Sequence, residues 1–281
     1  MDWAVKEARR AEIRIFAPFT DNYDYYHGGK FVFLRWRGID VPSQNLDERV
    51  QQFYTNRTII EDFKNYIKII LTHRNQFTNL TYAQDPTIFA YETGNELGGP
   101  VFGDKNVPAE WTQEITNYIK QIAPKKLTVD GTYGINESHL NISSVDIYSD
   151  HFYPMDVDKL SKGVAAVEKA EKVYFAAEYG WTPESQTKTK MDEFFKWIED
   201  RNGENSTSPV VVGDHFWSLF GRNVPDCSSF VEHSDGFTLH YDDPKNPANY
   251  TEQIVKIRQH LFKMQGKEVG QDMPSVPCPE Q

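Results

Sequence analysis

Two glutamates, Glu96 and Glu178, stand at the polar ends of two apolar runs. Residues 88–91 read Ile-Phe-Ala-Tyr and lead into Glu-Thr-Gly-Asn-Glu, while residues 173–177 read Val-Tyr-Phe-Ala-Ala and lead directly into Glu178. An ionised carboxylate costs several kcal/mol to bury unless it is paired, so an acid in this position indicates a functional site. Two carboxyl groups on one rim suit hydrolysis of a glycosidic bond, in which one protonates the leaving oxygen and the other attacks or stabilises the oxocarbenium-like carbon. We therefore predict that Glu96 and Glu178 face each other, roughly 5 to 5.5 Å apart if the configuration of the sugar is retained.

Four further side chains follow predicted strands and suit the same chemistry. The amide of Asn95, beside Glu96, is able to bond a sugar hydroxyl next to the reacting carbon. Tyr153 is placed to donate a hydrogen bond to the attacking carboxylate and keep it ionised, and His151 to help set the proton state of the acid. Trp217 offers an indole face on which a sugar ring can stack, although such a side chain is as often part of the core.

These side chains need a scaffold that brings strand ends together. Apolar runs predict strands over residues 12–19, 87–91, 127–130, 145–153, 173–178 and 210–219, and helical spacing predicts helices over 2–10, 58–75, 110–122, 157–172, 190–200 and 250–264. This alternation is typical of a parallel sheet with crossover helices. Because no glycine-rich phosphate loop follows any strand, a (β/α) barrel is favoured over an open doubly wound sheet, with roughly six of its units present. Residues 23–56 show little periodicity and are predicted to be a long functional loop.

Composition narrows the classes of partner. The chain has 281 residues, of which 39% are hydrophobic, and it lacks a linker rich in Ser, Gly and Pro, so a single domain spanning residues 1–281 is predicted. A net charge of -11 and a pI near 5.2 argue against nucleic acid as a partner. No run approaches the roughly eighteen apolar residues of a membrane span, so no membrane association is expected. Aromatic residues make up 14% of the chain, and such a surplus often lines a groove for sugars.

The sequence also carries signs of export. About two Asn-x-Ser/Thr sites are expected by chance for sixteen asparagines, yet six are present, at Asn56, Asn79, Asn136, Asn141, Asn205 and Asn249. The excess predicts a secreted glycoprotein, although the N-terminus shows no basic segment followed by an apolar one. In an oxidising compartment the two cysteines, Cys227 and Cys278, either pair and anchor the C-terminal tail or remain free thiols.

Several motifs occur in a characteristic order. A Gly-Asn-Glu strand end is followed by His-x-Tyr, by a Glu-Tyr-Gly strand end and by a Trp on the last predicted strand. In this order, and in the stretches 27–38, 53–56, 73–96 and 145–154, the sequence resembles glycoside hydrolase family 5, whose members are retaining enzymes with a (β/α)8 barrel. Within that family the likeness is greatest to the endo-β-1,4-mannanases of fungi and plants, and it extends over almost the whole chain.

The resemblance implies a role for each candidate residue. Glu96 is implied to be the acid/base, Glu178 the nucleophile, Asn95 the partner of the sugar 2-hydroxyl, His151 and Tyr153 the supports of the catalytic groups, and Trp217 the platform beneath the sugar. It further implies a monomer that needs no cofactor and cleaves internal β-1,4 bonds of mannan or glucomannan.

The sequence departs from the family pattern in two places. Mannanases of this group usually read Trp-Glu-Leu-x-Asn-Glu-Pro where residues 91–97 read Tyr-Glu-Thr-Gly-Asn-Glu-Leu, which bears on sugar preference. The first two strands of the family, with the Arg that ends the second, are expected before Met1. We therefore expect a TIM-type (β/α)8 barrel that lacks its first two strands, has an open sheet edge and shows low or no activity as residues 1–281.

Other interpretations remain beside this one. Glu92 follows Tyr91 directly, so we interpret it as a structural acid on the opposite face of the strand. Metal-ligand spacings and the Gly-x-Ser-x-Gly motif are missing from the sequence, so neither a catalytic metal nor a serine hydrolase is expected. Weaker candidates for lining a cleft are Trp36, Trp181, His27, His215 and His240. The alternative functions are a β-glucanase, another β-glycosidase of the same family, and a catalytically impaired carbohydrate-binding remnant.

Overall fold

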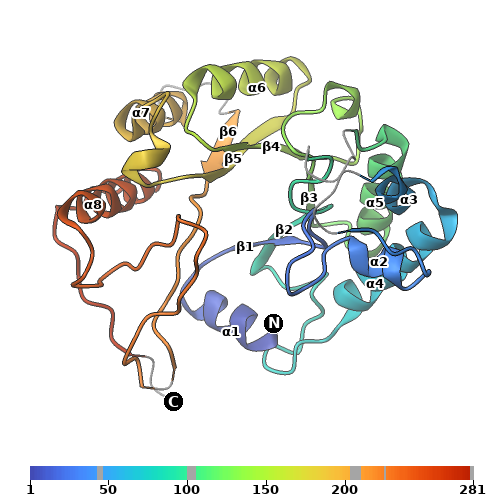
Figure 1. Ribbon diagram of the computed structural model, residues 1–281, viewed down its shortest axis with the longest axis horizontal. Helices are drawn as coiled ribbons and strands as arrows, with labels where there is room; N and C mark the ends of the chain where they lie inside the picture. The colour runs from blue at the N-terminus through green and yellow to red at the C-terminus, as the bar shows by residue number, and fades with distance from the viewer. Residues whose placement is uncertain (43–46, 100–105, 203–209, 225, 279–281) are drawn as a thin grey trace. The chain divides into compact units, whose positions relative to one another are not determined.

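The computed structural model describes residues 1–42, 47–99, 106–202, 210–224 and 226–278 (Figure 1). Packing divides the chain into two compact units. The first unit consists of residues 1–149 and 169–172, and the second of residues 150–168 and 173–281. The single domain predicted from the sequence stays a prediction.

The first unit is built on parallel strands. These are β1 (Ile15–Pro18), β2 (Ile88–Glu92), β3 (Leu127–Asp130) and the beginning of β4 (Ile147–Phe152). In register, Ala17 lies opposite Tyr91, Tyr91 opposite Thr128, and Val129 opposite Ile147. Because all these pairs are parallel, the polar residues that follow β1, β2 and β3 come out at the same edge.

The first unit also contains helical segments of very different lengths. The helical segments of the first unit are α1 (Asp2–Arg10), α2 (Phe31–Arg35), η1 (Glu48–Gln51), α3 (Gln52–Thr55), α4 (Arg57–Thr72), α5 (Ala109–Ile122) and η2 (Glu137–His139). Figure 1 shows α4 and α5 together on the same side of β2 and β3. Phe63 and Ile67 of α4 and Ile115 and Ile119 of α5 are fully buried at helical spacing, so the apolar faces of both helices enter one core.

The second unit contains a shorter sheet. It holds the end of β4, then β5 (Val173–Tyr179) and β6 (Val211–Asp214), which pair in parallel with Phe175 opposite Gly213. Its helical segments are α6 (Val157–Lys169, of which 157–168 lie in this unit), η3 (Pro183–Ser185), α7 (Met191–Asn202) and α8 (Ala248–Lys263). Helix α7 packs against both β6 and α8 (Figure 1).

A buried polar cluster joins β6, α7 and α8. His260 is 2% exposed; its Nε2 lies 3.0 Å from Asp214 and its Nδ1 2.8 Å from Glu199. Its ring stacks on Phe195 with centroids 4.0 Å apart. Burial acts to lower the pKa of His260, but the two carboxylates outweigh it and raise that pKa above its usual value. The Tyr179 hydroxyl also donates to Asp214, so the cluster ties the helices to the strand that carries Glu178.

Between β6 and α8, the described residues 218–224 and 226–240 form an irregular excursion, which we call the 218–240 excursion. Backbone hydrogen bonds close its neck, from Ser218 N–H to the Phe237 carbonyl and from Leu239 N–H to the Ser218 carbonyl, at 3.0 and 2.8 Å. Cys227 within it is disulfide-bonded to Cys278 in the C-terminal tail, with Cα atoms 5.8 Å apart. Of the two alternatives left open by the sequence, pairing is therefore the one observed.

The parallel strand-and-helix pattern predicted from the sequence is confirmed, with element ends displaced by a few residues. The prediction for residues 23–56 was wrong in part, because α2, η1 and α3 lie within them. These helices have only four or five residues each, too few for a periodicity to be visible.

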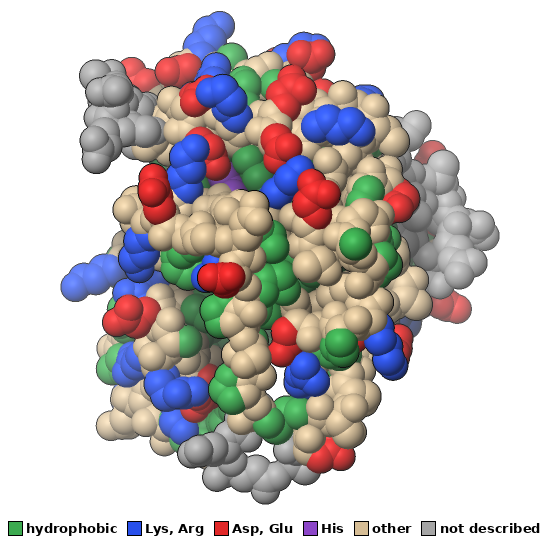
Figure 2. All heavy atoms as spheres, turned by 90° about the vertical axis from the view of Figure 1, so that its left-hand side faces the viewer, with side chains coloured by type: hydrophobic (Ala, Val, Ile, Leu, Met, Phe, Trp, Pro, Cys, Tyr) green, Lys and Arg blue, Asp and Glu red, His purple; other side chains and the backbone are tan. Residues whose placement is uncertain are grey.

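Charged groups are mixed over the surface that Figure 2 presents. On this face, Lys and Arg side chains are interspersed with Asp and Glu side chains, and neither sign gathers into a broad patch. This face therefore shows no basic stripe of the kind that binds nucleic acid. Among the described residues, no helix is both long enough and apolar enough to span a membrane.

Candidate active site

The segment that carries Glu96 is held by the loops on both sides of it. Asn95 N–H donates to the Thr20 carbonyl and Asn22 N–H donates to the Asn95 carbonyl, both at 2.9 Å, which fixes the segment to the loop after β1. Leu97 N–H donates to the Gly131 carbonyl, also at 2.9 Å, which fixes it to the loop after β3. The position of Glu96 is thus set by backbone bonds to both neighbouring strand ends.

Two backbone features at this position are unusual. A Cβ atom on Gly131 would lie 1.8 Å from the Gly94 carbonyl oxygen, so the loops approach closely enough to require glycine there. Glu96 has a φ of 53°, in the left-handed region that residues with a side chain rarely adopt. Backbone strain of this kind is maintained by the surrounding structure and is concentrated at functional sites. The φ of Glu96 therefore supports its choice as a candidate functional residue.

The Glu96 carboxylate accepts a hydrogen bond from a tyrosine. The Tyr23 hydroxyl, on the loop after β1, lies 2.6 Å from Glu96 Oε2, and the Tyr23 ring stacks on Tyr25 with centroids 5.3 Å apart. Burial, and then the Glu96 carboxylate, raise the pKa of Tyr23 well above its usual value. Tyr23 therefore stays protonated and acts as a donor to Glu96.

Asn95 is oriented by the same loop. Its side-chain amide donates to Asp21 Oδ2 at 3.3 Å, while Tyr23 N–H donates to the other oxygen of Asp21 at 2.8 Å. Burial raises the pKa of Asp21 above its usual value. Because Asp21 bonds both Asn95 and the backbone of Tyr23, it connects the residue beside Glu96 with the residue that bonds Glu96.

Glu178, at the end of β5, has its own pair of neighbours. The Tyr153 hydroxyl donates to Glu178 Oε2 at 2.8 Å, and His151 Nδ1 lies 3.4 Å from the same oxygen. The Glu178 side chain is 20% exposed, so it reaches solvent while being held in place. Lys159 Nζ in turn donates to the His151 carbonyl at 2.6 Å, which ties α6 to the end of β4.

Trp217 lies directly beside this strand end. Its backbone N–H donates to the Tyr179 carbonyl at 3.0 Å, and it forms a parallel bridge with Gly180. The side chain is exposed on part of its surface, 39%, which a core tryptophan would not be. Its indole N–H donates to Asp235 of the 218–240 excursion.

The structure brings the predicted residues together in two groups. Asn95 and Glu96 are adjacent in the first unit, and His151, Tyr153, Glu178 and Trp217 cluster in the second. Their roles, and the pairing of the two glutamates across one cavity, stay predictions.

Sequence reasoning missed Tyr23, Asp21 and Asp235. A signal for the first two was present, because Asp21 and Tyr23 follow β1 as Asn95 and Glu96 follow the neighbouring strand β2, and parallel neighbours end at one edge. For Asp235 no such signal exists, since it belongs to no periodic segment and meets Trp217 only through the folding of the excursion.

The weaker candidates separate into different environments. Trp36 is 63% exposed and, with His27, lines a cavity of about 420 Å³ beside β1 in the first unit. Trp181 is buried and His240 bonds the Val231 carbonyl inside the excursion, so both are structural. Burial lowers the pKa of His215, whose ring packs against Phe175.

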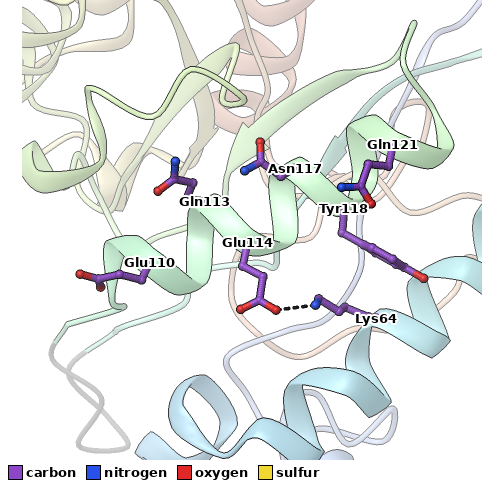
Figure 3. Close-up of a pocket in the computed structure, with 7 residues that line it drawn as sticks. All are labelled: Lys64, Glu110, Gln113, Glu114, Asn117, Tyr118 and Gln121. Atoms are coloured by element: carbon purple, nitrogen blue, oxygen red, sulfur yellow. Dashed lines mark ion pairs between the residues drawn. The ribbon is translucent and has the colours of Figure 1, made fainter.

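A second cavity of the first unit, of about 380 Å³, lies between α4 and α5 (Figure 3). Gln113, Asn117 and Gln121 project from one side of α5, and Lys64 reaches from α4 to Glu114. Arg57 adds a two-pronged contact to Glu114, at 2.6 and 2.7 Å. Since Lys64 and Arg57 both pair with Glu114, we interpret these charges as part of the packing between α4 and α5.

The chain matches a known family and several of its relatives. The family model described as "GH family 5 beta-mannosidase-like" matches residues 1–218. Mannan endo-1,4-beta-mannosidase 7 of Oryza sativa subsp. japonica is 28% identical over 235 residues, which cover 80% of this chain and 58% of that protein. Mannan endo-1,4-beta-mannosidase 5 of Arabidopsis thaliana is 30% identical over 184 residues, covering 54% of this chain and 41% of that protein. The chain thus spans little more than half the length of the rice relative.

Solved structures share the fold. The endo-1,4-beta-mannanase from Rhizomucor miehei aligns with a TM-score of 0.73 over 95% of this chain and 76% of its own, at 24% sequence identity. The endo-beta-1,4-mannanase from Thermotoga petrophila aligns with a TM-score of 0.72 over 96% of this chain and 62% of its own, at 22% identity. The prediction of a TIM-type fold is thereby confirmed.

Proposed function

The chain belongs to the glycoside hydrolase family 5 beta-mannosidase-like family, and from this premise we propose that it is a retaining glycoside hydrolase that cleaves internal β-1,4-mannosidic bonds. The observation that carries the proposal is the repetition of one arrangement: a glutamate at the end of a parallel strand or in the loop that follows it, bonded by a tyrosine hydroxyl. It occurs at Glu96 with Tyr23 and at Glu178 with Tyr153. A double displacement needs two such carboxyl groups.

Each displacement uses both glutamates. In the first, a Glu178 oxygen bonds to the anomeric carbon as the bond to the leaving oxygen breaks, and Glu96 gives its proton to that oxygen. In the second, Glu96 takes a proton from water, the water oxygen bonds to the anomeric carbon, and the Glu178 ester bond breaks. The sugar regains its original configuration because the carbon is inverted twice.

The neighbouring side chains support these steps. The Tyr153 hydroxyl stabilises the ionised form of Glu178, as a hydrogen bond to a carboxylate does, and His151 holds the same oxygen from another direction. Asn95, oriented by Asp21, is placed to bond the sugar hydroxyl beside the reacting carbon. The exposed indole of Trp217 supplies the stacking surface.

Mannan is the proposed substrate because the curated relatives are mannan endo-1,4-beta-mannosidases. The test is the release of reducing ends from galactomannan and from carboxymethylcellulose by a high concentration of residues 1–281, with Glu178→Ala as the matched control. We expect slow release from galactomannan that the variant loses. Retention of galactomannan without release would overturn hydrolysis in favour of a carbohydrate-binding protein, and release from carboxymethylcellulose alone would overturn the choice of sugar.

Export and glycosylation also belong to the proposal, together with a monomeric state. Support comes from the Cys227–Cys278 disulfide, because disulfides persist in oxidising compartments. Asn79, Asn141 and Asn249 are exposed and so accessible to glycan, whereas Asn205 lies outside the described residues. After expression through a eukaryotic secretory pathway, treatment with an amidase that removes N-glycans should lower the mass of the protein. An unchanged mass would contradict glycosylation.

A further inference from the structure

Asp235 in the 218–240 excursion is the centre of a small network around Trp217. Asp235 Oδ2 accepts the indole N–H of Trp217 and lies 3.2 Å from His233 Nδ1. Its other oxygen accepts the backbone N–H of Phe237 at 2.9 Å, which closes a tight turn through Gly236, whose φ is 86°. Burial acts to raise the pKa of Asp235, but the Phe237 and Trp217 donors outweigh it and hold the pKa below its usual value. The acceptor is therefore an ionised carboxylate, which makes a stronger bond to an indole than a neutral group does.

Phe237, two residues later, contacts Tyr153, the tyrosine that bonds Glu178. Its ring meets Tyr153 edge to face, with centroids 5.0 Å apart and planes at 65°. Its carbonyl accepts the Trp181 indole N–H at 2.5 Å. A Cβ atom on Gly180 would lie 2.8 Å from the Phe237 ring, so the ring sits tightly against the end of β5.

The geometry points to a role for this segment: we propose that Asp235 and Phe237 are positioning residues, Asp235 fixing the orientation of the Trp217 indole as a platform for a sugar ring, and Phe237 fixing the Tyr153 ring that bonds Glu178. The inference rests on the proposed function, since it takes the ligand of Trp217 to be a sugar of a β-linked polysaccharide. The turn formed by residues 235–237 thereby connects Trp217, the proposed sugar-binding surface, with Tyr153, which bonds Glu178.

An exposed tryptophan needs such a restraint. A side chain with 39% of its surface exposed lacks the packing that fixes a core ring, and its two side-chain torsions would otherwise sample several rotamers. A sugar that stacks on a mobile ring must first order it, which weakens binding. The hydrogen bond from the indole N–H to the Asp235 carboxylate orders the ring before the sugar binds, so binding does not have to supply the free energy of ordering it.

The first experiment observes the restraint without any substrate. Indole N–H resonances of the 15N-Trp-labelled chain are recorded for the wild type, Asp235→Ala, Asp235→Asn and Asp226→Ala, with Trp217→Phe to assign the signal. We expect the Trp217 signal to shift upfield and to exchange faster with water in Asp235→Ala, and to be largely restored in Asp235→Asn, whose amide oxygen still accepts. Asp226, an exposed acid of the same excursion that accepts from Ser228 N–H at 3.0 Å, serves as the matched control and should leave the signal unchanged. A Trp217 signal indifferent to Asp235→Ala would overturn the restraint, even in a chain that binds no sugar.

The second experiment measures mannohexaose affinity by calorimetry for the same variants and for Phe237→Leu. Asp235→Ala should weaken binding about tenfold, Asp235→Asn much less and Asp226→Ala not at all. Phe237→Leu should lower the rate of hydrolysis with little change in affinity, because its ring acts through Tyr153 rather than on the sugar. Equal affinities for the wild type and Asp235→Ala would overturn the proposed role. Failure of the wild type itself to bind would instead reject the mannan proposal, while the resonance experiment would still decide the restraint.

Discussion

The two glutamate sites differ in what holds them. Backbone hydrogen bonds to the loops after β1 and β3 hold the residues on both sides of Glu96, and Glu96 itself adopts a left-handed φ of 53°. Glu178 lies within β5, and its support comes from side chains, namely Tyr153, His151 and, through Tyr153, Phe237. The first arrangement fixes the position of the carboxyl group, while the second fixes its hydrogen-bonding environment. These different supports fit the proposed roles, in which Glu96 exchanges a proton and Glu178 remains ionised.

The sharpest test of this comparison is azide rescue of Glu96→Ala and Glu178→Ala. Each variant should lose on the order of 10⁴-fold in kcat/KM. With an activated aryl β-mannoside, azide should restore turnover in both, and the product should be the β-azide for Glu96→Ala and the α-azide for Glu178→Ala. NMR of the anomeric proton distinguishes them. The same anomer from both variants, or the opposite assignment, would break the division of roles.

A smaller effect is expected from the two tyrosines. Tyr153→Phe should lower kcat/KM by about 10- to 100-fold, since a hydrogen bond to a charged group is lost. Tyr23→Phe should lower it by less, because the acid role proposed for Glu96 requires that group to be protonated when the reaction begins. Loss of a donor raises the pKa of a carboxyl group. The acidic limb of the pH profile should therefore move upward in Tyr153→Phe and the alkaline limb upward in Tyr23→Phe. If Tyr153→Phe and Tyr23→Phe displaced the same limb of the pH profile by the same amount, the distinct roles proposed for Glu178 and Glu96 would be contradicted.

The two units should also differ in how much their charged groups contribute to stability. In the second unit the charged group is His260, buried between Asp214 and Glu199. The pKa of His260 is raised in the folded state, so its contribution is fully present below its unfolded pKa, about 6.5, and is lost as pH rises through the folded pKa. His260→Gln should cost about 1 to 3 kcal/mol at pH 5.5 and less at pH 9. Urea unfolding at both values measures this. A cost that grows with pH would show that the imidazolium is not what stabilises the cluster.

The smallest effect is expected at the surface of the first unit, between α4 and α5. Arg57, and then Lys64, lower the pKa of Glu114 to about 2. Its contribution is therefore present above the usual carboxyl pKa and is lost as pH falls toward 2. Glu114→Gln should cost about 0.5 kcal/mol at pH 7 and less at pH 3 or in 1 M salt, because ion pairs of this exposure are screened. Thermal unfolding under these conditions checks the size, and a cost comparable to that of His260→Gln would remove the contrast between the units.

The parts of the molecule that sequence could predict are those governed by local order. Helix α4 and strand β5 follow from the spacing of their own apolar residues, and Glu178 is conspicuous because it ends such a run. Helix α3, four residues long, is too short to show a period. The contact of Asp235 with Trp217 depends on how the 218–240 excursion closes on itself, and nothing in the spacing of these two residues encodes it.

The covalent link between the 218–240 excursion and the C-terminal tail has a practical consequence. Cys227 and Cys278 are separated by 51 positions, and the whole of α8 lies between them. A protease that cuts once anywhere in that stretch leaves two pieces that migrate as a single species until a thiol reagent is added. The mass of the unreduced protein would change only by one added water. Comparison of reduced and unreduced digests on a gel would therefore reveal the cut much more clearly.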